Sequence, residues 1–85
     1  MLVVDRHIMV SEGGYDIIVE IILDNITNTW IIWPARHSVN KYNMEFFSAS
    51  GMDKMVALEN FRRQLCVAVS NLNKRKEEND ANKTS

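Results

Sequence analysis

The sequence predicts an α+β domain in which a four-stranded antiparallel β-meander is followed by one long C-terminal helix. Two observations lead to this fold class. In the first half of the chain, apolar and polar residues alternate with a period of two between turn-forming residues, which is typical of strands. After residue 50 the apolar period changes to about 3.6, which is typical of a helix. The 85 residues suit a single domain, because chains normally divide only beyond about 250 residues.

The first two strands are predicted as a hairpin. The first strand is expected over Leu2–Val10, and Ser11–Gly14 is expected to form the turn, because paired glycines reach positive φ without steric cost. Tyr15–Asp24 gives the clearest strand pattern, since apolar residues of one parity run through its whole length. Asn25–Asn28 then supplies the next turn.

The remaining strands are shorter. Thr29–Trp33 is rich in aromatic and β-branched residues, and Pro34 ends it because proline lacks the N–H that a ladder needs. Ala35–Lys41 is expected to be a polar loop. Tyr42–Ser48 alternates again and is the predicted fourth strand.

A helix is predicted over 51–76, and it completes a domain that spans 1–76. Ser50–Asp53 matches the signature of a helix N-cap, in which a hydroxyl accepts a hydrogen bond from the first turn. The polar residues 77–85 are expected to form a flexible tail. The apolar stripe of the predicted helix consists of Met55, Leu58, Phe61, Leu65, Ala68, Val69 and Leu72.

One helix can cover only one face of such a sheet, so the other face needs a partner. The face expected under the helix comprises Val4, Ile8, Tyr15, Ile17, Val19, Ile21, Leu23, Ile31, Trp33, Met44 and Phe46. The interface with a partner is expected to include Ile18, Ile22, Trp30, Ile32, Phe47, Val56 and Val67. A second copy of the chain is the expected partner, because most soluble oligomers are twofold homodimers. The alternative is a sheet that curls strongly enough to cover both of its faces.

The composition favours a folded, intracellular protein. Apolar residues make up 46% and charged residues 25% of the chain, which is the range of globular domains rather than of disordered ones. The single cysteine, Cys66, cannot form an internal disulfide, so a reducing, cytoplasmic setting is expected. No apolar run approaches the roughly 18 residues that a membrane helix needs.

The usual signatures of enzymes are missing, so a non-enzymatic protein without metal or cofactor is predicted. The sequence has no Gly-rich phosphate loop, no Cys-x-x-Cys pair and no nucleophile elbow. His7 and His37 are the residue types of an acid–base pair, but nothing in the sequence brings them together. Cys66 is interpreted as a small structural hydrophobe rather than as a reactive thiol.

The distribution of charge is more informative than the net charge of −1. Residues 36–76 carry eight Lys and Arg against three carboxylates, whereas residues 1–35 carry one Arg against five. The basic residues expected to contact a phosphate backbone are Arg36, His37, Lys41, Arg62 and Arg63. Aromatic residues nearby, Trp30, Trp33 and Tyr42, offer stacking surfaces for single-stranded bases. RNA or single-stranded nucleic acid is therefore the expected ligand; a protein partner docked on the acidic and apolar sheet face around Asp16 and Glu20 is the alternative.

In fold alone, the meander with a terminal helix resembles the half-barrel of Whirly-type single-strand binders. In size, in its abundant Asn and Ile, and in compact segments such as Trp30–His37, the chain is similar to small accessory proteins of large lytic phages. These proteins disable host defences by stoichiometric binding, and one such family, the inhibitor of the ToxIN toxin–antitoxin system, has this length and binds RNA. The resemblance implies an antagonist of a host factor such as a toxin ribonuclease, acting in the host cytoplasm. It assigns no functional residue.

Overall fold

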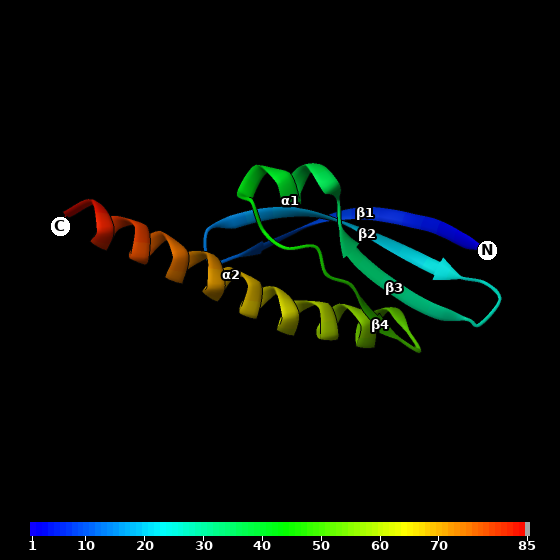
Figure 1. Cartoon of the computed structure of the whole chain (residues 1–85). Helices are drawn as coiled ribbons and strands as arrows, with labels where there is room; N and C mark the ends of the chain where they lie inside the picture. The colour runs from blue at the N-terminus through cyan, green and yellow to red at the C-terminus, as the bar shows by residue number, and fades with distance from the viewer. Residues whose placement is uncertain (85) are drawn as a thin grey trace.

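The computed structural model describes the backbone of residues 1–84 and the side chains of residues 1–77. It confirms the predicted fold class: one antiparallel sheet of four strands in the order β1-β2-β3-β4, followed by a long helix. Helix α2 extends along one face of the sheet from β4 to the C-terminal end (Figure 1). The elements in chain order are β1 (Leu2–Glu12), β2 (Tyr15–Asp24), β3 (Thr29–Pro34), α1 (Arg36–Tyr42), β4 (Ala49–Gly51) and α2 (Lys54–Thr84).

The core lies between α2 and the face of the sheet that carries Ile17, Val19 and Ile21 of β2, called here the helix face. Phe61 and Leu65 of α2 are fully buried against it, and the Phe61 ring stacks on Phe47 with a centroid distance of 5.0 Å. The buried seam of α2 consists of Ala57, Phe61, Leu65, Val69 and Leu72. Four of these residues follow a spacing of four, which places them on one side of a helix.

The helix begins three residues later than predicted. The carboxylate of Asp53, not the Ser50 hydroxyl, caps it by accepting a hydrogen bond from the N–H of Val56 at 2.9 Å. Ser50 and Gly51 belong to β4 instead. Met55 lies away from the buried seam and is 80% exposed, so its place in the predicted stripe is wrong. The flexible tail expected over 77–85 lies almost entirely outside the residues whose side chains are described and stays a prediction.

Strand β1 contains a bulge. Val4 pairs with Ile22 and Arg6 pairs with Ile21, so Asp5 has no partner of its own in β2. Residues that oppose each other across a ladder share a face. The extra residue therefore reverses the parity of β1, which explains why Val4, predicted in the core, is 50% exposed on the other face.

The two faces of β3 are the reverse of those predicted. Ile32 pairs with Ile21, and Trp30 pairs with Leu23, so both lie on the helix face. Ile31 and Trp33 lie on the opposite face, which carries Ile18, Glu20 and Ile22 of β2 and is called here the groove face. Apolar residues of both parities fill β3, and only the register decides which of them face the core.

This register corrects much of the predicted interface. Ile32 is fully buried in the core, so it is not open to a partner. Trp30 and Phe47 lie on the helix side and are half-buried against the core. Ile22 lies on the groove face but is 1% exposed, because β2 is a central strand and Val4 and Ile31 flank it. The other interface residues differ in exposure: Ile18 is half-buried, whereas Val56 and Val67 are exposed on α2.

The segment predicted as a polar loop is helix α1, and tertiary contacts explain why. Pro34 ends β3 opposite Val19, which leaves the first part of β2 without a strand on that side. Helix α1 satisfies this edge: the N–H of Ala35 donates to the Ile18 carbonyl, and the N–H of Ile18 donates to the Ser38 hydroxyl at 3.0 Å. The short helix thus replaces a ladder along β2.

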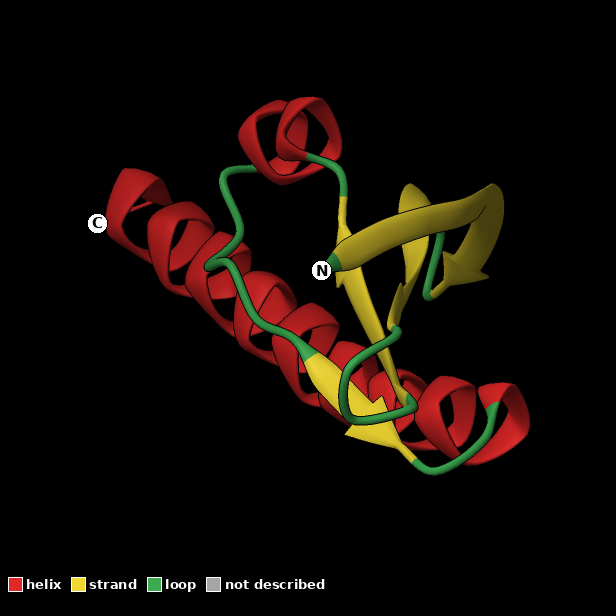
Figure 2. Ribbon diagram, turned by 90° about the vertical axis from the view of Figure 1, so that its right-hand side faces the viewer, coloured by secondary structure: helices red, strands yellow, loops and turns green. Residues whose placement is uncertain are grey.

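The segment predicted as the fourth strand is mostly a loop. Helix α1 extends to Tyr42 and ends at Asn43, whose φ of 54° is left-handed. The loop 43–48 then passes over α2 to reach β4, which is three residues long (Figure 2). Met44 is buried as predicted, whereas Phe46 is 56% exposed and does not belong to the core.

Candidate nucleic-acid interface

A groove of about 950 Å³ lies on the groove face, beside the start of α1. Three strands of the sheet contribute to it: β1 and β2 each supply a polar residue, and the end of β3 supplies an aromatic ring. The loop 43–48 adds Phe46 and Ser48. Its lining residues are His7, Glu20, Trp33, Pro34, Ala35, Arg36, His37, Phe46 and Ser48. The described part of the chain therefore brings aromatic, cationic and acceptor groups together in one place.

Two aromatic rings form a wall of the groove. The centroids of Trp33 and Phe46 are 6.3 Å apart, and the ring planes are tilted by 48°. The indole Nε1 of Trp33 donates a hydrogen bond to Oε2 of Glu20 at 3.0 Å, which fixes the orientation of the indole. Phe46 has a more exposed ring than Trp33, so Phe46 offers the larger free surface for stacking.

The basic side chains of the groove, one arginine and two histidines, come from α1 and β1. Arg36 and His37 are exposed in the first turn of α1. His7 reaches in from β1, and its Nε2 lies 3.7 Å from Oε1 of Glu20. Glu20 is thus already shared between a hydrogen bond from Trp33 and a contact with His7, and the guanidinium of Arg36 is left for a ligand.

The structure does not bring all five predicted basic residues together. Lys41 lies at the other end of α1 from Arg36, with Nζ 5.2 Å from the centroid of the Tyr42 ring. Arg63 is paired with Glu59 on α2 at 3.0 Å. Arg62 lies on a different flank of α2, close to Cys66 and β1. Arg36 and His37 are the two that share the groove.

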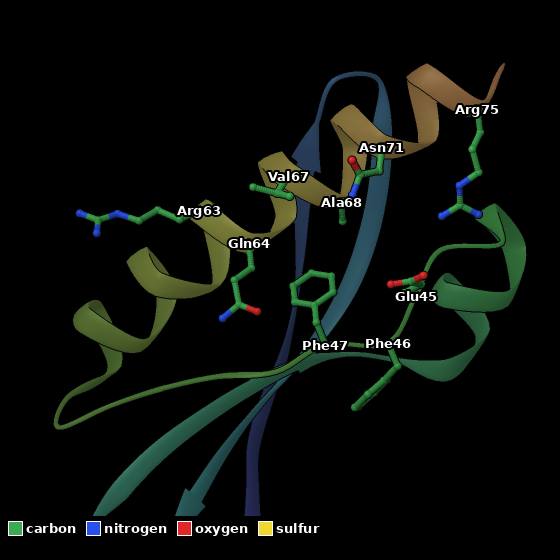
Figure 3. A pocket seen from close by; sticks show the side chains of 9 residues that line it. All are labelled: Glu45, Phe46, Phe47, Arg63, Gln64, Val67, Ala68, Asn71 and Arg75. Carbon is green, nitrogen blue, oxygen red and sulfur yellow. The ribbon is translucent and has the colours of Figure 1, made fainter. Parts of the chain in front are cut away.

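Arg63 lines a second pocket, of about 370 Å³, between α2 and the loop 43–48 (Figure 3). Phe47 extends toward α2 at the centre of this pocket. The Arg75 side chain points from α2 toward the end of the pocket where Glu45 lies. The lining residues are Glu45, Phe46, Phe47, Arg63, Gln64, Val67, Ala68, Asn71 and Arg75. Phe46 belongs to both cavities.

Cys66 is exposed, so the interpretation of this residue as a packed hydrophobe is wrong. Its thiol interacts with Glu12 at the end of β1. This hydrogen bond, together with partial desolvation and the negative charge of Glu12, raises the pKa of the Cys66 thiol, and nearby Arg62 opposes the rise. The thiolate is disfavoured, which is the opposite of what a nucleophilic cysteine requires.

Sequence reasoning missed several groove residues. Phe46 was expected in the core only, and Trp33 was assigned both to the core and to a stacking surface for bases. No pattern placed His7 near His37, although both line the groove. The signal available in the sequence was the pair of aromatics on both sides of the basic Arg36–His37 step. Among the side chains of residues 1–77, no three His, Cys, Asp or Glu residues gather as metal ligands would.

No protein-family model, curated protein or solved structure matches this chain. In the part of the chain that the structure describes, neither helix is both long and apolar enough to cross a membrane.

Proposed function

We propose that this protein binds RNA or single-stranded nucleic acid, without catalysis, through the groove beside α1. The observation that carries the proposal is that one open groove holds two aromatic rings, the half-buried Trp33 and the exposed Phe46, together with Arg36 and His37. Proteins that bind single strands combine these two elements: aromatic faces on which bases stack and cations that follow the phosphate backbone.

Each group has a distinct role in this proposal. A base stacks on the exposed face of Phe46, beside the Trp33 ring that Glu20 holds in place. The Arg36 guanidinium contacts a backbone phosphate through two parallel N–H donors. The carboxylate oxygens of Glu20 accept a further hydrogen bond from an amino group on the edge of a base.

The proposed role of this binding is stoichiometric antagonism of a host defence factor such as a toxin ribonuclease. The resemblance to phage accessory proteins supports it, because such proteins act by binding. An accessory protein that occupies RNA or a ribonucleoprotein needs a binding groove and no catalytic centre. Incubation with the purified protein should therefore leave the RNA intact, and turnover that is lost in His37→Ala would contradict this part of the proposal.

The direct test is fluorescence anisotropy with a labelled single-stranded RNA of about 15 nucleotides. Affinity should fall steeply between about 50 and 200 mM salt, because each neutralised phosphate releases counterions. Phe46→Ala should weaken binding by roughly 5- to 100-fold, the range for loss of one stacked base. Circular dichroism of each variant checks that the fold is retained.

A matched pair of charge reversals locates the site. Arg36→Glu reverses a charge inside the groove, and Arg62→Glu reverses one on the far flank of α2. We expect the first to weaken binding by at least about tenfold and the second to leave it within about twofold. Equal effects of the two reversals, or affinity that ignores salt, would reject the groove as the binding site. Docking on a basic protein through Asp16 and Glu20 predicts instead that RNA does not bind at any salt concentration.

A further inference from the structure

Strand β1 forms an edge of the sheet that nothing pairs with in the described part of the chain. It has β2 on one side only, and its residues from Leu2 to His7 are all exposed. The apolar side chains left in water on this strand include Leu2, Val3, Val4 and Met9, with exposed fractions of 53, 44, 50 and 61%. Soluble proteins commonly guard such an edge with charged residues, proline or a bulge. β1 contains no lysine or proline, and its bulge and its charges, Asp5 and Arg6, are confined to one place in the strand.

We propose that β1 pairs antiparallel with β1 of a second copy of this chain, about a twofold axis between Asp5 and Arg6, and so forms a continuous eight-stranded sheet. In this register Leu2 opposes the second copy's Met9, and Val3 opposes the second copy's Ile8. Asp5 opposes the second copy's Arg6. This homodimer replaces the predicted interface on the sheet face, and it does not rest on the proposed binding of nucleic acid.

The bulge at Asp5 selects this register. A twofold axis perpendicular to a sheet keeps each face on its own side, so residues that pair must lie on the same face. Pairing with β2 places Val3 and Ile8 on the helix face and Leu2 and Met9 on the groove face. Val3 and Ile8 share a face although one position number is odd and the other even, and the same holds for Leu2 and Met9. In a regular strand such positions would lie on opposite faces, so these residues can oppose each other only in a register centred on the bulge. The two bulges then face each other, and neither interrupts the pairing.

The charges at the centre of the register are complementary. The carboxylate of Asp5 contacts Arg6 at 3.0 Å and Lys54 at 3.1 Å within one chain, so Asp5 and Arg6 project to the same side of the sheet. In the dimer, each carboxylate also meets a guanidinium of the other copy. The axis therefore repeats an opposite-charge pair twice. On each side, Val4 next opposes the second copy's His7, and the apolar pairs formed by Val3 and Leu2 follow.

Neither helix obstructs this edge. Helix α2 packs mainly on β3 and β4, and it approaches the β1–β2 hairpin at the turn, where Val69 lies against Gly13. Helix α1 packs on β2 on the side away from β1. Lys54 at the start of α2 reaches β1 on the helix face, where its Nζ lies 3.1 Å from Oδ2 of Asp5. In the described part of the chain, neither helix makes a backbone hydrogen bond to residues 2–9, the part of β1 that pairs.

The test is a mixing experiment with two charge variants, Asp5→Arg and Arg6→Asp. The wild-type chain should sediment as a dimer, and each variant alone should raise the dimer dissociation constant by on the order of tenfold or more, because like charges then meet at the axis. An equimolar mixture of the two variants should recover dimers, since arginines of one copy then oppose aspartates of the other. The control Val67→Lys, on exposed α2 surface far from the edge, should stay dimeric.

A cross-link fixes the register and guards against a variant that merely misfolds. In a Cys66→Ser background, the double variant Leu2→Cys with Met9→Cys should be bridged between copies by a short bismaleimide, because the two positions are opposed. Each single variant should not be bridged, since identical positions lie about 23 Å apart along the strands. A monomeric wild-type protein, a mixture that recovers no dimers, or a dimer broken by Val67→Lys and not by Asp5→Arg would overturn the proposal.

Discussion

Strands β1 and β2 form one hairpin and are both rich in β-branched residues, yet they are buried to very different extents. In β2, Ile17, Val19, Ile21 and Ile22 are all buried, whereas in β1 only Val10 is. The difference comes from position: β2 has neighbours along both edges, and β1 has one. A strongly apolar pattern therefore predicts a strand, and it is the place in the sheet that decides how much of the strand is hidden.

The largest expected effect comes from truncating β2. Ile17→Ala removes a side chain with no exposed surface and leaves a cavity under α2, so the free energy of unfolding should fall by about 2–5 kcal/mol. Met9→Ala, at an exposed position of β1, should change it by less than about 0.5 kcal/mol. Urea denaturation at low protein concentration measures both in the monomer. Equal losses would show that β1 is as well packed as its neighbour.

The turn that joins the two strands offers an intermediate effect. Gly13 has a φ of 55°, and a Cβ added there would lie 2.7 Å from Cγ1 of Val69. Gly13→Ala should therefore cost about 1–3 kcal/mol from overpacking, in addition to the left-handed backbone cost of about 1 kcal/mol. Gly14→Ala should show only the backbone cost, because nothing lies within 4 Å of its added Cβ. Thermal unfolding of the two variants compares them, and a larger loss at Gly14 would contradict the contact between the hairpin and α2.

The smallest effect concerns the bulge. A hydrogen bond from Lys54, with a further contribution from Arg6, holds the pKa of the Asp5 carboxyl below its usual range. A lowered pKa in the folded state stabilises the protein above the usual Asp pKa, near 4, and this contribution is lost as the pH falls through the folded pKa. In Lys54→Ala, the pKa of Asp5 should rise, and the acid limb of the stability curve should become less steep. An NMR titration of the Asp5 carboxyl checks this, and an unchanged pKa would mean that the ion pair is not formed in solution.

The sequence predicted β2 well because only one reading of its alternation is possible, and its bounds, Tyr15–Asp24, agree with the prediction. In β3 the run Trp30–Trp33 is apolar at both parities, so its own sequence cannot say which side faces the core. The answer depends on the register with β2, which is a tertiary property. The bulge at Asp5 is invisible for the same reason.

Helix α1 and the groove show a different limit of prediction. The segment from Arg36 to Tyr42 is short and polar, and the contacts of Ser38 and Tyr42 with the unpaired edge of β2 help hold it. Arg36 and His37 were predicted to act together because they are neighbours in the sequence, and both line the groove. Phe46 was assigned to a strand that does not form, and so its exposure in the groove was not foreseen.

The Phe46 ring is a shared wall between the groove beside α1 and the pocket against α2. A molecule that pushes this ring aside to enter one cavity changes the shape of the other, so the two cavities are not independent. By thermodynamic linkage, whatever factor the first occupant imposes on the affinity of the second is imposed in return. One phenylalanine thus gives this small domain the means to make two binding events depend on each other.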